Sequence, residues 1–355
     1  MEEATSLRVP KRLGSKAILV MRNLKLSNSQ LTVKRERDYV IIPLYRVPTT
    51  KETKVLKTLL QETEITLDRF EKRKIRKAKT LRMILEDKLS PQLLAKLPRS
   101  MDIIGQVAII EVPPELEGYE KLLGETVIEI HRNVKTVLAK AGAVSGEHRL
   151  RKFKTIAGTG ETETTYREHG CTYILDLAKV YFSPRLSQER WRIAQKVRGG
   201  EVVIDMFTGV GPFSILIAKK NCDVKVYAID VNPIAIKFLN RNIDANKVGN
   251  VCPILGDAKE VIENTLAGQA DRAIMNLPER AIEFVDVACK ALKPSGGIIH
   301  YYGFESESDG LEKTKESLIK AVFQAGRKVK TVLDYRFVRQ TAPYEWQIAV
   351  DALIS

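Results

Sequence analysis

The stretch Val202-Val203-Ile204-Asp205-Met206-Phe207-Thr208-Gly209-Val210-Gly211-Pro212-Phe213 decides which fold this chain adopts. It opens with a short apolar run, which is typical of a strand buried on both faces of a parallel sheet. Gly209 and Gly211 follow, and glycine lets a backbone pass close beneath a ligand. A helix is expected from Pro212, and its first turn presents free N–H groups. The pattern therefore predicts a strand, a ligand-binding loop and a helix.

Two phosphate-binding loops fit this stretch poorly. GVGPF lacks the third glycine of the dinucleotide-binding GxGxxG pattern, and no GK[ST] of a P-loop follows. Asp205 stands four positions before the first glycine. A carboxylate there is unfavourable beside a phosphate but favourable beside a cation. S-adenosylmethionine carries a sulfonium and an ammonium group, so the loop favours it as the cofactor.

Acidic residues also end the next two expected strands. Asp230 ends VKVYAID, 21 residues after Gly209, where a carboxylate can accept hydrogen bonds from both ribose hydroxyls. Asp257 ends the following strand, in GDA, where the amino group of adenine would lie. Acids and glycines at strand ends also serve turns and helix caps. Three such sites at successive strand ends nevertheless predict a methyl-donor fold.

Strands and helices alternate from residue 202 onward, which predicts a doubly wound, Rossmann-like α/β domain of the class I methyltransferase type. VKTVLDYRFV and QIAVDALIS read as a closing antiparallel pair. Two smaller α+β domains are expected before it. We expect helices over 9–26, 51–97 and 118–141, and a strand over 39–47 that ends near Pro48. The expected domains are a small N-terminal tRNA-binding module with a basic helical linker at 1–72, a middle α+β RNA-binding domain at 73–190, and the methyltransferase domain at 191–355.

The positive charge of the chain is concentrated at its start. The net charge is +14 over 355 residues, and residues 1–100 hold 24 basic and 11 acidic residues. Six basic residues fall within Glu71 to Thr80. A localised basic excess on an otherwise neutral chain indicates a part that binds a polyanion such as nucleic acid. A solvated, lysine-rich helix face is the alternative. The basic run has no Trp or Phe face beside it, so an anionic membrane surface is less favoured.

Composition excludes several other classes. Hydrophobic residues make up 44% and charged residues 29%, an ordinary globular balance. No apolar run approaches the roughly 18 residues of a membrane span, and the first residues do not read as a signal peptide. The four cysteines are scattered without a CxxC pair, and the four histidines show no metal spacing. We expect a reduced cytoplasmic protein with no metal, no membrane partner and no obligate protein partner.

Two motifs concern the substrate. Asn276-Leu277-Pro278-Glu279 follows the fourth strand of the sheet. An asparagine offers both a donor and an acceptor, so it can hold a base edge, although a turn asparagine before a helix is the alternative. The segment 180–191, VYFSPRLSQERW, joins the middle part to the sheet domain. Its Tyr-Phe pair beside Arg185 could stack a base, or the segment could simply start a helix with solvated first-turn charges.

Several motifs occur in an order that resembles the archaeal and eukaryal tRNA (guanine-37-N1)-methyltransferase family. They are HRLRKFKTIAG, YREHG, VYFSPRLSQER, DMFTGVGPFS, AIDVNP and NLPERA. The resemblance covers roughly residues 95–355 and continues more weakly through 6–46. It implies methyl transfer from S-adenosyl-L-methionine to N1 of guanosine 37, just 3′ of the anticodon. It also implies that the N-terminal module contacts the outer corner of the tRNA, while the other parts grip the anticodon arm.

The resemblance also assigns roles to individual residues. Glu189 would be the general base that removes the N1 proton, and Arg149 would stabilise the charge that builds on O6. Asn276 and the backbone near Pro278 would hold the base edge. Tyr181 would pack on the cofactor or the base, and Arg190 would contact the cofactor carboxylate. The expected cofactor-binding set is Tyr181, Arg190, Asp205, Phe207, Gly209, Gly211, Asp230, Val231, Asp257, Ala258 and Asn276.

Other functions remain open at this stage. An enzyme of the same ancestry could methylate a wyosine precursor at position 37 or transfer the aminocarboxypropyl arm of the same cofactor. A non-catalytic RNA-binding protein could retain the fold, and loss of cofactor binding would identify it. A small-molecule methyltransferase would leave the basic first 100 residues unexplained, and salt-sensitive tRNA binding would exclude it.

Overall fold

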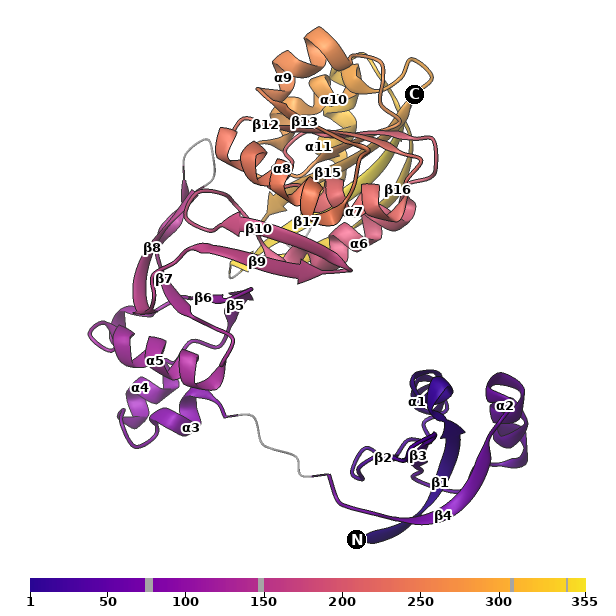
Figure 1. The fold of residues 1–355 in the computed structure, drawn as a ribbon. Helices are drawn as coiled ribbons and strands as arrows, with labels where there is room; N and C mark the ends of the chain where they lie inside the picture. Colours follow the sequence, from indigo (N-terminus) through magenta and orange to yellow (C-terminus); the bar gives the residue numbers. More distant parts are fainter. Residues whose placement is uncertain (74–78, 146–149, 307–309, 343) are drawn as a thin grey trace. The chain divides into compact units, whose positions relative to one another are not determined.

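The computed structural model describes residues 1–73, 79–145, 150–306, 310–342 and 344–355. The chain forms two compact units, Met1–Ala78 and Lys79–Ser355 (Figure 1). The division into three domains at 1–72, 73–190 and 191–355 stays a prediction.

The first unit is a four-stranded antiparallel sheet in the order β2-β3-β1-β4, with two helices. Its core contains apolar residues of β1, β3 and both helices. The expected helix starting at residue 9 begins only at Gly14, because Val9 and Pro10 belong to β1, and the expected strand ends at Pro43 rather than near Pro48. The elements are β1 (Glu2–Pro10), η1 (Lys11–Leu13), α1 (Gly14–Asn23), β2 (Lys34–Arg35), β3 (Tyr39–Pro43), α2 (Thr50–Leu60) and β4 (Glu64–Phe70).

Strand β4 corrects the prediction of helix throughout 51–97. Thr49 caps α2 with a capping box to Glu52, and that helix ends at Leu60. Residues 64–70 then pair with β1, from Glu2 opposite Phe70 to Arg8 opposite Glu64. A strand partner some sixty residues earlier leaves no local signal, and Ile65 and Leu67 are exposed rather than turned to a core.

The second unit begins with a smaller sheet in the order β5-β6-β7-β8. Strands β6 and β7 are parallel and are joined by the crossover helix α5, whose apolar face packs on the sheet. The predicted helix over 118–141 is therefore wrong in its second half, because pairing with β6 and β8 overrides the helix propensity of Leu138, Ala139 and Lys140. The elements are α3 (Leu81–Leu85), α4 (Pro91–Ala95), β5 (Met101–Ile104), β6 (Val107–Ile110), η2 (Pro114–Leu116), α5 (Glu120–Ile130), β7 (Thr136–Ser145) and β8 (Leu150–Gly158).

A hairpin of β9 (Glu163–Glu168) and β10 (Cys171–Asp176) follows and packs on the larger sheet domain. The side-chain amide of Asn242 contacts the backbone of Ile174, with N–H···O distances of 2.6 and 3.1 Å. Asn246 makes the same pair of bonds to Thr172. These buried amides join the hairpin to helix α8. They therefore fix the position of the hairpin, and the chain runs from it to residue 181.

The largest sheet has seven strands in the order β13-β12-β11-β14-β15-β17-β16. Strands β11 to β15 are parallel, and β17 inserts antiparallel between β15 and β16. This confirms the predicted doubly wound α/β domain and its closing antiparallel pair. The elements are η3 (Pro184–Leu186), α6 (Ser187–Lys196), β11 (Val202–Asp205), α7 (Pro212–Lys220), β12 (Lys225–Asp230), α8 (Pro233–Asn246), β13 (Val251–Leu255), α9 (Ala258–Val261), η4 (Ile262–Leu266), β14 (Arg272–Met275), η5 (Ala281–Phe284), α10 (Val285–Ala291), β15 (Gly297–Glu305), α11 (Gly310–Gln324), β16 (Val329–Ala342) and β17 (Glu345–Ile354).

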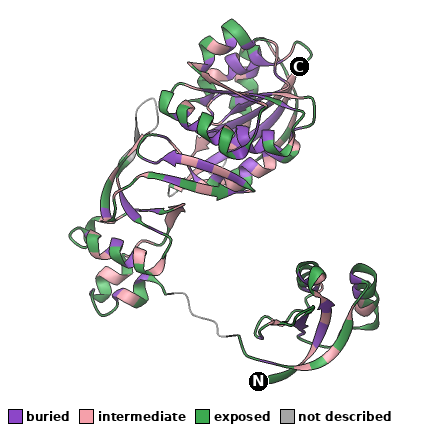
Figure 2. Cartoon of the chain, viewed as in Figure 1, coloured by how far each residue is buried: buried purple, intermediate pink, exposed green. Residues whose placement is uncertain are grey.

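Helices cover both faces of this sheet. One apolar core joins the sheet to α6, α7, α8 and β10, and a second joins it to α9, α10 and α11. Buried residues concentrate in the strands between these layers (Figure 2). The strand order reverses at β11, which lies between β12 and β14. Ligands of open α/β sheets bind at the carboxyl ends of the strands at such a point.

No helix among the described residues is both long and apolar enough to cross a membrane.

Candidate active site

The loop after β11 turns at two glycines with left-handed backbone angles. Gly209 has φ 57° and Gly211 has φ 85°. A Cβ on Gly211 would lie 2.3 Å from Cδ1 of the buried Leu239, so this position has no room for a side chain. The Gly209 N–H donates to Oδ2 of Asp230 at 2.7 Å. The end of the second strand therefore fixes the loop of the first.

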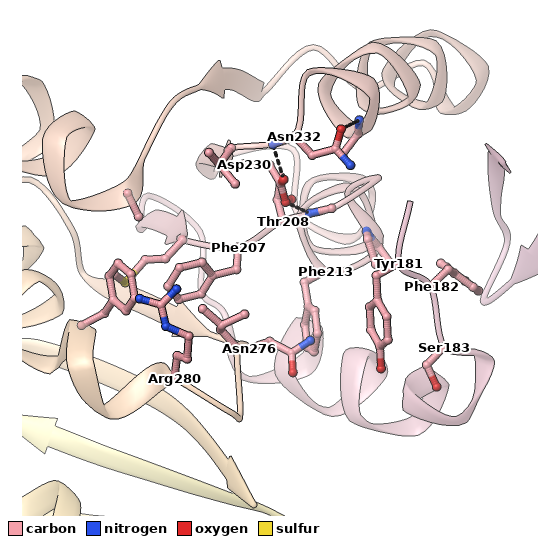
Figure 3. A pocket seen from close by; sticks show the side chains of 18 of the residues that line it. Tyr181, Phe182, Ser183, Phe207, Thr208, Phe213, Asp230, Asn232, Asn276 and Arg280 are labelled. Carbon is pink, nitrogen blue, oxygen red and sulfur yellow. Dashed lines mark hydrogen bonds between the residues drawn. The ribbon is translucent and has the colours of Figure 1, made fainter. Parts of the chain in front are cut away.

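A cavity opens beside this loop at the carboxyl ends of the strands (Figure 3). Its wall brings together segments that lie far apart in sequence: 181–190, the glycine loop, the ends of β12 and β13, and the turn after β14. Phe207 and Phe284 pack edge to face on one side, with ring centroids 5.0 Å apart. Nine of the residues expected at the cofactor line this cavity: Tyr181, Arg190, Phe207, Gly209, Asp230, Val231, Asp257, Ala258 and Asn276.

Two carboxylates at strand ends lie on the cavity wall. Asp230 accepts one backbone N–H on each oxygen, from Gly209 at 2.7 Å and from Asn232 at 2.9 Å. These bonds fix the plane of the carboxylate, and each oxygen can accept a further hydrogen bond. Asp257 accepts from the N–H of Lys259 at 2.7 Å and caps α9. Each of the two carboxylates therefore accepts backbone hydrogen bonds and also lines the cavity.

Asp205 lies behind the loop and does not line the cavity. Its side chain is buried, with only 1% exposed. Oδ2 accepts from the Ser214 hydroxyl at 2.7 Å, while Oδ1 has no hydrogen-bond partner among the described residues. Burial, and to a smaller extent the negative charge of Asp230, raise the pKa of this carboxyl to about 6, although the nearby Ser214 and Thr208 hydroxyls lower it. A cation near the loop would satisfy this carboxylate.

Arg190 lines the cavity, and its guanidinium also binds other groups of the protein. Its guanidinium makes a bidentate pair with Glu168 at 2.5 and 2.8 Å, and Nη1 donates to the carbonyl of Ser183 at 3.1 Å. The Phe182 ring lies over the guanidinium, 5.2 Å from its carbon. The pair joins Arg190, in the first turn of α6, to Glu168 at the end of hairpin strand β9.

A second cavity adjoins the first and shares Tyr181, Phe182 and Ser183 with it. Its lining is mixed. Basic side chains come from Lys140, Arg151, Arg185 and Arg339, aromatic rings from Phe153, Phe182 and Phe304, and carboxylates from Asp102, Glu279 and Glu345. Arg185 is bound to Asp102 at 2.7 Å. Aromatic rings beside cations are what an unstacked nucleotide requires of a protein.

Glu189 is buried and lines neither cavity. Its carboxylate accepts from the Tyr302 hydroxyl at 2.6 Å, from Arg192 at 2.6 and 3.0 Å, and from Arg336 at 2.7 and 2.8 Å. Burial raises the pKa of this carboxyl, but the two arginines and the hydroxyl outweigh burial, so the pKa lies below its ordinary value. As the side chains stand, Glu189 is an ionised and fully bonded carboxylate.

The remaining predicted residues are placed as follows. Gly211 lies beneath the loop at the start of α7, and Pro278 is buried behind the turn after β14; neither is part of the lining of the two cavities. Arg149 lies outside the described residues, so the structure does not place it. No group of three or more potential ligand side chains that could hold a metal ion occurs in the part of the chain that is described.

Several polar residues of the site were not identified from the sequence. Arg336 and Arg339 on β16 and Gln347 on β17 reach the segment around residue 181 and the Asn276 side chain. In sequence, the two arginines look like solvated charges on an edge strand. Asn232 caps α8 with its side chain, and the Asn-Pro pair in AIDVNP could have identified that cap.

The strand order, the loop and the cavity together define a class I methyltransferase fold. Comparison with known families supports this class. Residues 164–330 match the TRM5/TYW2 methyltransferase domain, and residues 81–162 match the TYW2 N-terminal domain. The chain belongs to the TRM5/TYW2 methyltransferase family.

Curated relatives include methyltransferases and aminocarboxypropyltransferases. The chain is 49% identical to tRNA (guanine(37)-N(1))-methyltransferase Trm5b of Pyrococcus abyssi over 75% of this chain and 78% of that protein. It is 35% identical to Trm5b of Methanocaldococcus jannaschii over 98% of both chains. It is also 36% identical to the tRNA(Phe) (4-demethylwyosine(37)-C(7)) aminocarboxypropyltransferase of that organism, over 70% of this chain and 95% of that protein.

Solved structures agree with these relatives. A complex of aTrm5 with tRNALeu matches with a TM-score of 0.67 and 33% identity over 99% of both chains. The structure of M. jannaschii TYW2 in complex with AdoMet matches with a TM-score of 0.56 and 32% identity, over 72% of this chain and 99% of that one.

Proposed function

We propose that this protein transfers a methyl group from S-adenosyl-L-methionine to N1 of guanosine at position 37 of tRNA. The observation that carries the proposal is the pair of adjoining cavities. One has acids and aromatic rings at the carboxyl ends of the strands, and the other combines basic and aromatic side chains with three carboxylates. Tyr181 and Phe182 stand between them, so a methyl donor in the first would face a base in the second. The two guanine-37 methyltransferases named above match 75% and 98% of this chain.

The first cavity suits S-adenosyl-L-methionine. Asp230 would accept hydrogen bonds from the ribose hydroxyls, and Asp257 would accept one from the adenine amino group. Phe207 would pack against the adenine ring. The orphaned, buried Oδ1 of Asp205 favours positive charge near the glycine loop. When bound, the cofactor supplies an electrophilic methyl group on a sulfonium.

The guanine would enter the second cavity after leaving its stack, which is easiest for a loop nucleotide. N1 of guanine is a poor nucleophile while it carries its proton. We assign removal of that proton to Glu189, which requires its carboxylate to exchange one present partner for the base. We expect Arg336 to leave, because it comes from β16, whereas Arg192 lies on α6 with Glu189 and also pairs with the buried Asp351. Arg149 would stabilise the charge on O6, and Asn276 with the Pro278 backbone would hold the base edge.

All three parts of the chain would contact the tRNA. The N-terminal module at 1–72 would contact the outer corner of the tRNA, and the domains at 73–190 and 191–355 would grip the anticodon arm. The excess of basic residues among the first 100 supports this division. We place the enzyme in the cytoplasm, where it would meet its tRNA substrate.

Replacing Glu189 by glutamine tests the assignment of the base. In single-turnover assays with saturating cofactor and tRNA, the variant should transfer methyl roughly 100- to 10,000-fold more slowly, the usual contribution of a general base. Its affinity for tRNA should stay within about twofold of the wild type. Glu163→Gln is the matched control, because that glutamate is exposed and pairs with Arg241 on the surface. A weakened tRNA affinity with an unchanged rate would count against the role of Glu189.

A second candidate is an enzyme that acts later on the same nucleotide. The observation that favours it is the 36% identity to an aminocarboxypropyltransferase. Cofactor labelled in the methyl group and cofactor labelled in the carboxyl group distinguish the two reactions. Label from the methyl group alone, on tRNA with guanosine 37, supports our proposal. Label from the carboxyl group, on tRNA with 4-demethylwyosine at 37, supports the second candidate.

A further inference from the structure

Three polar side chains form a continuous chain of hydrogen bonds behind the cofactor cavity. Nε of Arg339 on β16 donates to Oε1 of Gln347 on β17 at 2.8 Å. Nε2 of Gln347 donates to Oδ1 of Asn276 at 3.2 Å. Gln347 is 1% exposed, and Asn276 lies on the cavity wall in Figure 3. The closing hairpin therefore contacts the residue that follows β14.

The far end of this chain is anchored at the junction of the two cavities. Nη1 of Arg339 donates to the Ser183 hydroxyl at 2.8 Å, and Nη2 donates to the Tyr181 hydroxyl at 3.2 Å. Three of its nitrogens thus have partners on two different elements. Rotation of the guanidinium would break all of these bonds, so its Nε–H direction is fixed.

The polarity of the chain follows from what each group can do. A guanidinium only donates, so the Gln347 amide must turn its oxygen toward Arg339. The amide nitrogen of Gln347 then faces Asn276, and an amide N–H2 also only donates. Asn276 must therefore turn Oδ1 toward Gln347. Its own Nδ2, which carries two N–H donors, then faces the cavity.

We propose that Arg339 and Gln347 are positioning residues that make Asn276 a hydrogen-bond donor to O6 of the target guanine. This inference rests on the proposed function. On the Watson–Crick edge of neutral guanine, O6 is the acceptor, while N1 and N2 carry hydrogens. As the N1 proton leaves, negative charge grows on O6, and a fixed N–H donor there stabilises it. Adenine carries an amino group at position 6, so two donors would meet, which disfavours it.

A double-mutant cycle tests whether Gln347 acts through Asn276. Gln347→Met removes the donor with little change of volume. We expect it to lower the single-turnover rate on tRNA with guanosine 37 by about tenfold to hundredfold. In an Asn276→Ala background the same change should cause no further loss. An equal loss in both backgrounds, or an unchanged rate in the single variant, would overturn the inference.

Gln347→Glu keeps the bond to Arg339 but cannot donate to Asn276. Asn276 should then turn its N–H2 toward the new carboxylate and present Oδ1 to the base. We expect the ratio of the rates on guanosine 37 and adenosine 37 transcripts to fall at least about tenfold. Gln195→Glu adds the same charge at an exposed site of α6 and should leave the ratio unchanged. A slower rate with an unchanged ratio would show a structural effect alone and overturn the inference.

The wild-type assay separates this inference from the proposed function. If the wild type forms no 1-methylguanosine on the guanosine 37 transcript, the proposed function fails. If the wild type is active but the cycle is additive and the ratio is constant, only the positioning role fails.

Discussion

Replacing Asp205 by asparagine should stabilise the cofactor-free protein and weaken cofactor binding at the same time. The carboxylate is buried, with one bond to Ser214 and one oxygen that has no partner among the described residues. Such a group is unfavourable in the folded protein alone but suited to a cationic ligand. The substitution separates these two effects.

The magnitude follows from the proton affinity of Asp205. Burial raises its pKa to about 6 from an ordinary 3.8. At about 1.4 kcal/mol for each tenfold change in affinity, ionised Asp205 costs the folded protein about 3 kcal/mol at pH 7.5. Because the pKa is higher in the folded state, the folded protein binds more protons between about pH 4 and 6. The cost therefore grows as the pH rises through this window and is absent below it.

Asparagine avoids the charge but places an N–H2 where Oδ1 has no partner, which costs about 1–3 kcal/mol. We expect the variant to be more stable than the wild type by up to about 2 kcal/mol at pH 7.5. Relative to the wild type, the stability of the variant should fall by about 2.5 kcal/mol between pH 7.5 and pH 4, so that the variant is the less stable protein at pH 4. Cofactor affinity should fall at least about tenfold at pH 7.5.

Urea unfolding followed by tryptophan fluorescence measures the effect. The two tryptophans of the chain, Trp191 and Trp346, both lie in the second unit, so the signal reports the unit that contains Asp205. Calorimetric titration measures cofactor affinity. Asp351→Asn is the contrasting control, because that buried carboxylate is paired with His300, Arg192 and Lys196. It should be destabilising by about 3–5 kcal/mol, as expected for a broken buried pair.

Destabilisation of the protein by Asp205→Asn at pH 7.5 would refute this prediction. A stability difference from the wild type that is the same at pH 7.5 and pH 4 would also refute it, since the predicted cost depends on ionisation.

Further predictions concern the base, the loop and the N-terminal unit. Arg336→Gln should raise the pKa of Glu189 and move the acidic limb of the single-turnover pH–rate profile to higher pH; an unmoved limb would separate Arg336 from the base. Gly211→Ala should destabilise the second unit by about 1–3 kcal/mol in the urea assay, because φ is 85° and the new Cβ would meet Leu239; an unchanged midpoint would contradict this. Removal of Met1–Ala78 should weaken tRNA binding and reduce its salt dependence, with cofactor affinity retained in calorimetry; unchanged tRNA affinity would refute the N-terminal module.

The seven-stranded sheet could be predicted because its signals are local. Strands β11 to β14 are short, largely apolar runs, and the helix after β12 begins at a recognisable cap, Asn232 before Pro233. Strands β4 and β7 could not be predicted in the same way. They exist because partners in β1, β6 and β8 supply hydrogen bonds, and that pairing is invisible in a local window.

The site shows the same division. Asp230 and Asp257 were found because parallel strands bring their carboxyl ends to one edge, whatever the details of packing. The contacts of Arg339 with Ser183 and of Arg336 with Glu189 join segments about 150 residues apart. They depend on how the closing hairpin packs on α6, so sequence spacing cannot predict them. The hydrogen-bond partners of Glu189 could not be predicted from the sequence either.

Methyl transfer to two tRNA transcripts tests the central claim most directly. The transcripts are identical except for guanosine or adenosine at position 37, and the cofactor carries a labelled methyl group. We predict label on the guanosine transcript alone, recovered after digestion as 1-methylguanosine. Label recovered in another nucleoside, equal label on both transcripts, or no label on either while the cofactor is bound would contradict the proposed function.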